Sequence, residues 1–374
     1  MAVGVIFLIM GALFGNWATL IPIIKAKFGL DDAQLGLMIL CLPVGGFLAN
    51  PVSTWFIHKY GMQRMTLIGV SIMCVCYILP VAAPSPIWVG MGLLASGMGI
   101  AFTNVSMNTC ASVIEVQMKA HIMATCHGLF STGLMMGSLL SSTMIGLGVA
   151  PFIQSLSISV TLGIIAWSLS GIILSIKDQH DHEINGDEPK QGFTWPRGVL
   201  LLMIGVAMCT NLTEGAMADW TAVYMRDVVK SAAYTLGWGL AAYSGSMALG
   251  RFIGDYIIPR FGANAILKYG GILSAAGLLM AILIPKTWVC VVAFGLVGFG
   301  VSCGAPIMYG AAARLPNLAK GVGLATLNTF SVVAFLGGPV MIGFISKAIN
   351  LQTGIGLVCI VGLLWSWLSG KVKL

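Results

Sequence analysis

The sequence predicts an all-α membrane protein with twelve transmembrane helices in two six-helix bundles. The chain has 374 residues, of which 58% are hydrophobic and 8% are charged, whereas soluble domains carry about 25% charged residues. A mean hydropathy of +0.95 and 48 glycines fit helices that pack closely in lipid. The apolar runs are long and nearly continuous, which excludes the short alternating segments of a membrane β-barrel.

The helices follow from run length, because a bilayer core of about 30 Å needs roughly 20 apolar residues per helix. Six spans are predicted in the first half, at 2–24, 35–57, 65–83, 86–110, 122–148 and 152–176. Six more are predicted in the second half, at 198–225, 234–258, 264–284, 287–311, 319–345 and 350–370.

A polar segment separates the two sets of spans. Its acidic residues, Gly and Pro cannot form a core, so it is predicted to be a cytoplasmic linker. The expected domains are therefore an N-terminal bundle over 1–176, the linker over 177–197 and a C-terminal bundle over 198–374.

Two patterns support this organisation. With the N-terminus inside, the cytoplasmic loops and tail hold twelve Lys and Arg and the outer loops hold six, which predicts two cytoplasmic termini. The second span ends in Lys59-Tyr60-Gly61 and the eighth in Arg260-Phe261-Gly262. A turn that recurs at the same place in each half indicates an internal repeat.

Other classes of protein are disfavoured. The net charge is +7, but the basic residues are scattered through short loops, so no nucleic-acid partner is predicted. The nine Cys have no metal-like spacing and are expected to be packed free thiols. No Walker loop, HExxH, paired CxxC or GxSxG motif is present, so the chain is not expected to be an enzyme or to hold a metal or cofactor.

Charged residues inside the spans are candidates for function, because such groups cost about 2.5–3.5 kcal/mol to insert. Glu214 and Asp219 lie five residues apart on the seventh span, and either could bind substrate or a proton or form an interfacial contact. Arg251 and Asp255 lie four apart on the eighth span, a spacing that brings side chains together. They are expected to pair with each other in a structural or gating role.

Three further residues are expected to act in gating or structure. Glu115 and Arg314 lie at the inner ends of the fourth and tenth spans and are predicted to tie loops and halves together in one conformational state. His127 opens the fifth span; its imidazole could titrate near neutral pH, or it could be a helix-packing histidine.

Uncharged polar residues could line a cavity. Asn16 and Trp17 lie on the first span, and Asn104 and Asn108 lie one turn apart on the fourth. The asparagines of the fourth span could equally serve as hydrogen-bonding contacts between helices. Both roles stay open at this stage.

The layout and the two recurring turns resemble the major facilitator superfamily over essentially the whole chain. Within it, the chain is similar to the fucose-permease-like branch of bacterial inner-membrane transporters. This second likeness rests on Glu214-Gly215-Ala216 through Asp219-Trp220, His127 to Ser131, Gly250 to Gly254, and Pro22 with Phe28-Gly29-Leu30. The resemblance implies a monomer in the lipid bilayer that works by alternating access, often with a proton gradient.

The chain departs from the family pattern where acidic residues are usual. His58 and Pro259 stand three positions before the turn glycines, Trp17-Ala18 replaces a first-span carboxylate, and Asn104 stands where branch members carry Asp or Glu. Any proton carrier is therefore predicted in the C-terminal half, at Glu214 or Asp219, unless coupling is absent.

The sequence thus predicts a proton-coupled carrier of a small polar solute, such as a sugar or a related metabolite. One alternative is an efflux carrier of amphipathic compounds, since 22 Met and 16 Phe could line an adaptable cavity. Another is a membrane sensor or partner protein that does not transport. The predicted substrate-binding residues are Asn16, Trp17, Asn104, Asn108, Glu214 and Trp220.

Overall fold

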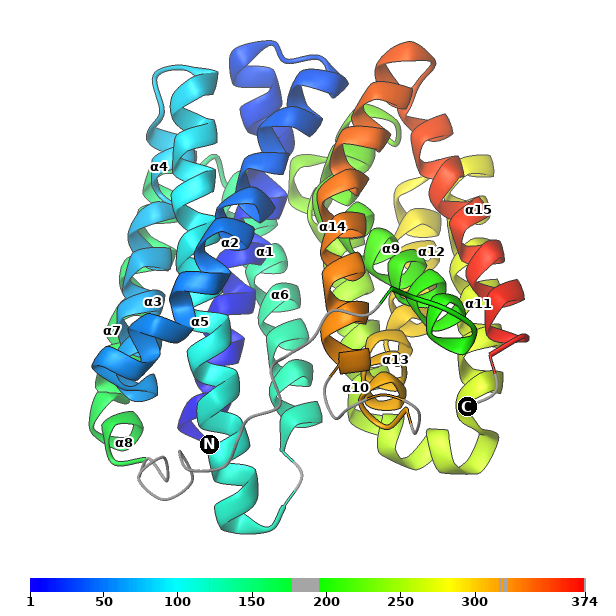
Figure 1. Ribbon diagram of the computed structural model, residues 1–374. Helices are drawn as coiled ribbons and strands as arrows, with labels where there is room; N and C mark the ends of the chain where they lie inside the picture. Colours follow the sequence, from blue (N-terminus) through cyan, green and yellow to red (C-terminus); the bar gives the residue numbers. More distant parts are fainter. Residues whose placement is uncertain (121, 177–194, 316–317, 319–321, 373–374) are drawn as a thin grey trace.

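The computed structural model describes residues 1–120, 122–176, 195–315, 318 and 322–372, and in them the predicted all-α architecture is confirmed. Two bundles stand side by side, α1–α8 in one and α9–α15 in the other (Figure 1). Both termini lie at the same end of the molecule (Figure 1). This end is called the terminus side below, and the opposite end is called the distal side.

The N-terminal bundle contains the six predicted spans, two of which are divided by a short break. The spans are α1 (Ala2–Phe28), α2 (Asp32–Tyr60), α3 (Met62–Cys76) with α4 (Leu79–Ala82), α5 (Pro86–Met118), α6 (Met123–Gly146), and α7 (Pro151–Ser168) with α8 (Ser170–Leu174).

The C-terminal bundle repeats this pattern. Its elements are α9 (Val199–Asp227), the 3-10 turn η1 (Ala233–Thr235), α10 (Trp238–Phe261), α11 (Ala263–Leu283), α12 (Thr287–Val301) with α13 (Gly304–Ala313), α14 (Val322–Ala348) and α15 (Leu351–Ser369). The proposed linker over 177–197 lies, apart from its last three residues, outside the described part of the chain.

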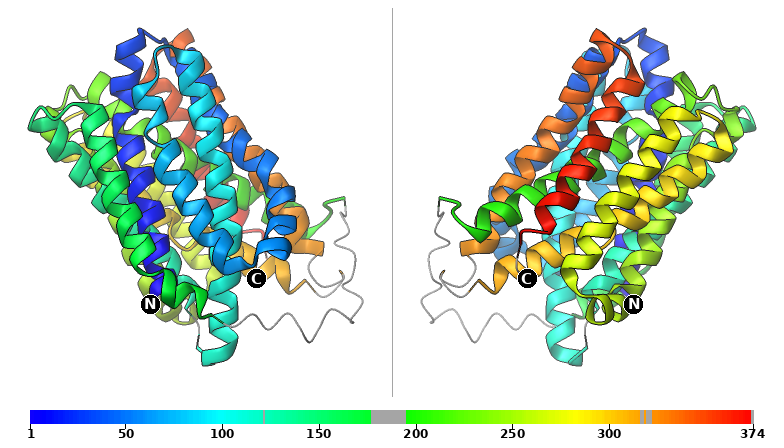
Figure 2. Two further views of the ribbon diagram at one scale, coloured as in Figure 1. Left: turned by 90° about the vertical axis from the view of Figure 1, so that its left-hand side faces the viewer. Right: turned by 90° about the vertical axis from the view of Figure 1, so that its right-hand side faces the viewer.

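Eleven helical segments of the described chain are long and apolar enough to cross a membrane. The eighth span, α10, is not among them, because Arg251 and Asp255 lower its hydropathy. Large apolar side chains such as Trp88, Phe152 and Ile360 are exposed on the outer surface, which is typical of a multi-pass membrane protein. Figure 2 shows the long, tilted helices from two sides.

The predicted repeat of the turns is confirmed in backbone geometry. Gly61 joins α2 to α3 with φ 82° and ψ 147°, and Gly262 joins α10 to α11 with φ 81° and ψ 144°. Side-chain-bearing residues rarely adopt this conformation. The two halves therefore use glycine to make the same reversal at the same place.

Glycines also let helices touch backbone to backbone within each bundle. A Cβ atom added at Gly97 of α5 would lie 1.9 Å from the Leu42 carbonyl oxygen of α2, and one at Gly298 of α12 would lie 1.9 Å from the Tyr243 carbonyl oxygen of α10. Small residues at such crossings are a common basis of helix packing in lipid.

Substitution of Gly97 by alanine is expected to destabilise the N-terminal bundle by about 1–3 kcal/mol, because α5 must move away from α2. Thermal unfolding in detergent, followed by tryptophan fluorescence, measures the effect. Gly171→Ala is the control, since a Cβ atom at Gly171 meets nothing within 4 Å. Equal melting temperatures for the two variants would contradict this packing.

Candidate functional site

A cavity of about 680 Å³ lies between the two bundles. Phe7, Met123 and Ile258 extend its lining toward the terminus-side ends of α1, α6 and α10. A central position with walls from both halves is typical of the binding site in transporters built from repeats. The polar and charged residues of the lining are Asn104, Asn108, His127, Asn211, Glu214, Arg251, Asp255, Ser302 and Tyr309.

Arg251 of α10 joins the two halves across this cavity. Its Nη2 atom lies 2.8 Å from Glu214 Oε1 on α9, forming a salt bridge within the C-terminal half. Its Nη1 atom donates to Ser131 Oγ at 2.8 Å and to the His127 carbonyl oxygen at 3.3 Å, both on α6 of the N-terminal half. The Arg251 guanidinium therefore forms an ion pair within its own half and hydrogen bonds to the opposite half at the same time.

The expected pairing of Arg251 with Asp255 is wrong for this structure. Spacing along one helix favours contact between these side chains, but Glu214 on the neighbouring helix takes the guanidinium instead. In the described part of the chain Asp255 has no salt bridge, and it lines two cavities. Its role in gating stays a prediction.

Asn104 and Asn108 line the cavity, which is one of the two roles that the sequence left open, and they are hydrogen-bonded to each other. Asn108 Nδ2 donates to Asn104 Oδ1 at 2.6 Å and to the Asn104 carbonyl oxygen at 2.8 Å. This pair shows no hydrogen bond to another helix in the described residues, so its side chains present amide groups to the cavity rather than bridging helices.

A smaller cavity of about 340 Å³ adjoins the first and shares Asn104, Asn211 and Tyr309 with it. Its walls come from α2 and α5 on one side and from α9, α13 and α14 on the other. The lining is uncharged throughout. The two cavities therefore differ in chemistry: one contains an ion pair and the other contains amide and hydroxyl groups.

Three of the predicted binding residues are buried away from these cavities. Asn16 is 2% exposed and lies inside the N-terminal half, where Nδ2 donates to Ser155 Oγ at 3.2 Å and Oδ1 accepts from Gln154 Nε2 at 2.7 Å. Trp17 and Trp220 are among the most deeply buried side chains. In this conformation all three contribute to packing.

Asp219 is 8% exposed and does not line the cavities described above. It has no salt bridge among the described residues. Asp219 and Glu214 thus occupy different surroundings, as a separation of five positions along one helix implies.

Glu115 and His127, the predicted gating or structural residues near the terminus side, contact neighbouring parts of the N-terminal half. Glu115 Oε1 accepts from the backbone N–H groups of Ile122 and Met123 at 2.6 and 2.9 Å, so it caps the start of α6, where N–H groups lack helical partners. Glu115 and Arg314 were predicted to tie loops and halves together in one conformational state, and in the described residues neither forms a salt bridge. The His127 ring packs edge-on against Phe7, with ring centroids 5.3 Å apart.

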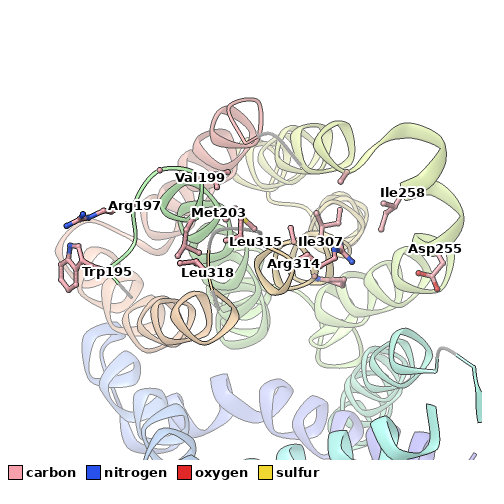
Figure 3. A pocket seen from close by; sticks show the side chains of 16 residues that line it. Trp195, Arg197, Val199, Met203, Asp255, Ile258, Ile307, Arg314, Leu315 and Leu318 are labelled. Carbon is pink, nitrogen blue, oxygen red and sulfur yellow. The ribbon is translucent and has the colours of Figure 1, made fainter. Parts of the chain in front are cut away.

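Arg314 instead lines a third cavity, of about 1040 Å³, within the C-terminal half (Figure 3). Trp195 and Arg197 lie at one end of its lining and Asp255 at the other, with Arg314 between them (Figure 3). Most of the remaining lining is apolar. This cavity lies in a single bundle, so it lacks the two-sided wall of the central one.

The two halves are pinned together on the distal side. Lys25 Nζ of α1 lies 2.6 Å from Asp32 Oδ1 of α2 and 2.5 Å from Asp227 Oδ2 of α9. Arg226 of α9 donates to the Pro22 carbonyl oxygen of α1. These five residues are called the distal latch below. The central cavity therefore reaches toward the terminus side while charged contacts hold the distal side closed.

A second ion pair on the distal side is more exposed. Lys347 Nζ lies 2.9 Å from Asp31 Oδ2, and the two side chains are 56% and 36% exposed. Asp31 also caps α2 by accepting from the Gln34 backbone N–H at 2.8 Å. This backbone hydrogen bond, and then Lys347, hold the pKa of Asp31 below its ordinary value.

Sequence reasoning missed the latch and much of the cavity lining. In the sequence, Lys25 and Arg226 count only as loop charges that indicate membrane topology. Their contacts were missed because each joins residues about two hundred positions apart. Asn211 lies on the same span as Glu214, three residues before it. That spacing on one helix face was the one signal in the sequence that could have marked it.

The chain also resembles known proteins. Residues 2–234 match the model of the Major Facilitator Superfamily. An uncharacterised MFS-type transporter of Yersinia pestis is 30% identical over 332 residues, which cover 88% of this chain and 84% of the relative. The membrane protein MosC of Rhizobium meliloti is 29% identical over 339 residues, which cover 90% of this chain and 80% of the relative.

Solved structures share the fold. A mutant of the nucleoside transporter NupG superposes with a TM-score of 0.77 at 11% identity, covering 100% of this chain and 99% of that one. A bacterial homologue of the human lysosomal transporter Spinster, in an inward-facing and unoccupied conformation, gives 0.74 at 13% identity, covering 99% and 96%. The family match over more than half of the chain and the 30% identical relative lead to one conclusion. This chain is a membrane transporter that belongs to the Major Facilitator Superfamily.

Proposed function

We propose that the chain carries a small polar solute, such as a sugar or a related metabolite, across the bacterial inner membrane by alternating access. The observation that carries the proposal is the central cavity, in which the Glu214–Arg251 pair is hydrogen-bonded to the opposite bundle through Ser131. A solute that binds there contacts both halves, so its binding can change their relative position.

The proposed orientation places both termini in the cytoplasm. The cavity then opens toward the cytoplasm, and the distal latch closes the outer side. In the alternate state the latch would break and the terminus-side ends of the bundles would approach each other. Ion pairs that form in one state and break in the other are a common basis of such transitions.

Protons are the proposed driving ion, and Glu214 is the proposed carrier. A proton on Glu214 would remove the charge that binds Arg251 and so weaken the bridge to Ser131. The charged or titratable groups around it in the cavity are Arg251, Asp255, His127, Cys303 and Tyr309. Asp219 is the second candidate, because a buried carboxylate without a cation is costly unless it is neutralised.

Efflux of amphipathic compounds is the alternative that a specific observation favours. Phe7, Met10, Met107 and Phe130 line the central cavity, and methionine-rich surfaces adapt to varied apolar ligands. Such substrates would bind along this apolar wall and depend little on the polar groups.

Transport in proteoliposomes with a pH dye inside tests these proposals. Each solute of a panel of monosaccharides, nucleosides and amphipathic dyes is added in turn, and lumen pH and labelled solute are recorded. Nucleosides are included because the structural relative NupG is a nucleoside transporter. Solute-dependent proton movement would support coupled transport, and uptake without proton movement would contradict the coupling.

Glu214→Gln is expected to abolish solute-dependent proton movement, because glutamine cannot release a proton. If Asp219→Asn abolishes it instead, the carrier is Asp219. Asp31→Asn is the control, since asparagine keeps the helix cap and Asp31 lies on the exposed distal surface. A flat response to every solute, with binding retained, would favour a sensor that does not transport.

A further inference from the structure

The smaller cavity concentrates uncharged hydrogen-bonding groups from both halves. Asn104 lines it from α5, Asn211 from α9, Tyr309 from α13, and Asn328 and Ser331 from α14. In the described part of the chain, one hydrogen bond joins two of these groups, from the Tyr309 hydroxyl to Asn328 Oδ1 at 3.5 Å. Asn104 Oδ1 also accepts from Asn108 Nδ2 at 2.6 Å, so the unused bonding capacity in the described chain lies at the Asn211 amide nitrogen and the Ser331 hydroxyl.

Two of the groups are buried and unpaired. Asn211 is 7% exposed and Ser331 is 3% exposed, and neither Asn211 Nδ2 nor Ser331 Oγ has a hydrogen-bond partner in the described chain. Nearly all buried polar atoms in proteins are hydrogen-bonded. Both residues line the same cavity, but each unpaired atom exposes less than 1 Å². A ligand in the cavity can therefore bond to them once the two side chains rotate toward it.

The lining determines which partner fits. Asparagine amides and the Ser and Tyr hydroxyls both donate and accept hydrogen bonds, and no charged side chain lines this cavity. A carboxylate or phosphate would therefore lose its hydration without gaining a cation. Hydroxyl groups match this mixture of donors and acceptors, and Phe47 and Phe335 in the wall can pack against the carbon skeleton.

We propose that the smaller cavity is a subsite for an uncharged polyhydroxylated solute, with Asn211 and Ser331 as specificity-determining residues. The proposal rests on the function proposed above and names its class of substrate. Asn211 and Ser331 bind from the C-terminal half and Asn104 from the N-terminal half, so the solute bridges the bundles beside the Arg251 contact. A volume of about 340 Å³ lies within the usual range for small-molecule sites.

Binding to the purified full-length protein in detergent tests the subsite separately from transport. The probes are neutral monosaccharides and sugar alcohols, with the corresponding sugar acids as charged counterparts, and affinity is measured by calorimetry. A neutral probe is expected to bind, and its sugar acid is expected to bind at least roughly tenfold more weakly. Binding of no neutral probe, or preference for the acid, would overturn the proposal.

Two variants locate the site. Asn211→Leu and Ser331→Ala are each expected to weaken binding of the neutral probe by roughly tenfold, because each loses one hydrogen bond. Ser346→Ala is a matched control: Ser346 also lies on α14 and is 5% exposed, with an unpaired Oγ, but it lines none of the three cavities. Unchanged affinity in both site variants, or an equal loss in the control, would overturn the assignment.

The outcomes also separate this proposal from the proposed function. If neutral probes bind, the two variants lower their affinity and no probe crosses the membrane of proteoliposomes, the proposed subsite is supported and the proposed transport is contradicted. If solutes cross and neither variant changes their affinity, transport stands and the subsite fails.

Discussion

Replacement of Arg251 by glutamine is expected to reduce solute transport by at least roughly tenfold. Arg251 contacts Glu214 in one half and Ser131 in the other, so its loss leaves a carboxylate without its cation and breaks the contact between bundles. Removing one member of a buried ion pair costs about 3–5 kcal/mol. This is an upper limit here, because the Glu214 side chain is 22% exposed.

Initial rates in proteoliposomes measure this effect for any solute that the panel identifies. Arg251→Lys keeps the positive charge but replaces the planar guanidinium, with its several N–H donors, by a single ammonium group. Its transport rate is therefore expected to lie between those of Arg251→Gln and the wild type. Arg260→Gln is the control on the same helix, since Arg260 is exposed and donates a hydrogen bond to the Tyr256 hydroxyl of its own helix. Wild-type rates for Arg251→Gln would show that the bridge is not part of the transport cycle.

Replacement of Lys25 by alanine is expected to open the distal side. Lys25 binds Asp32 and Asp227 together, so its removal leaves two carboxylates facing each other across the bundles. A loss of about 2 kcal/mol from the closed state corresponds to a shift of roughly thirtyfold in the ratio of the two states. The expected result is a population with the distal ends apart.

Distances between spin labels at positions 30 and 349, on opposite halves of the distal side, measure this shift. Cys41 and Cys359 are only partly buried, and both are replaced by serine before labelling. Lys347→Ala is the control, because its pair with Asp31 is exposed and exposed pairs contribute about 0–1 kcal/mol. Equal distance distributions for Lys25→Ala and the control would contradict a latch at Lys25.

The agreement between sequence and structure is best where local rules act. Each span is recognisable because a helix in lipid must satisfy its backbone hydrogen bonds within itself. The turns at Gly61 and Gly262 are recognisable because their backbone angles favour glycine. The contact between Asn104 and Asn108 is recognisable because residues one helical turn apart lie on the same face.

Contacts between helices were harder to predict. Asp255 is closer to Arg251 in sequence, but Glu214 binds it, because the orientation of α9 relative to α10 brings that carboxylate nearer. Asn16 and Trp220 have side chains suited to a binding site, but they face the interior of a bundle. A polar residue on an apolar helix has the same local sequence whether it faces a cavity or a neighbouring helix.

The sequence by itself determined the membrane location, the helical class, the repeat and the family, since these depend on composition, run length and short motifs. Only the tertiary structure decided that Arg251 joins the halves, that Lys25 closes the distal side and that Asn211 and Ser331 meet in one cavity. These contacts join residues as many as about two hundred positions apart. They depend on how twelve helices rotate and tilt against one another, which no single segment encodes.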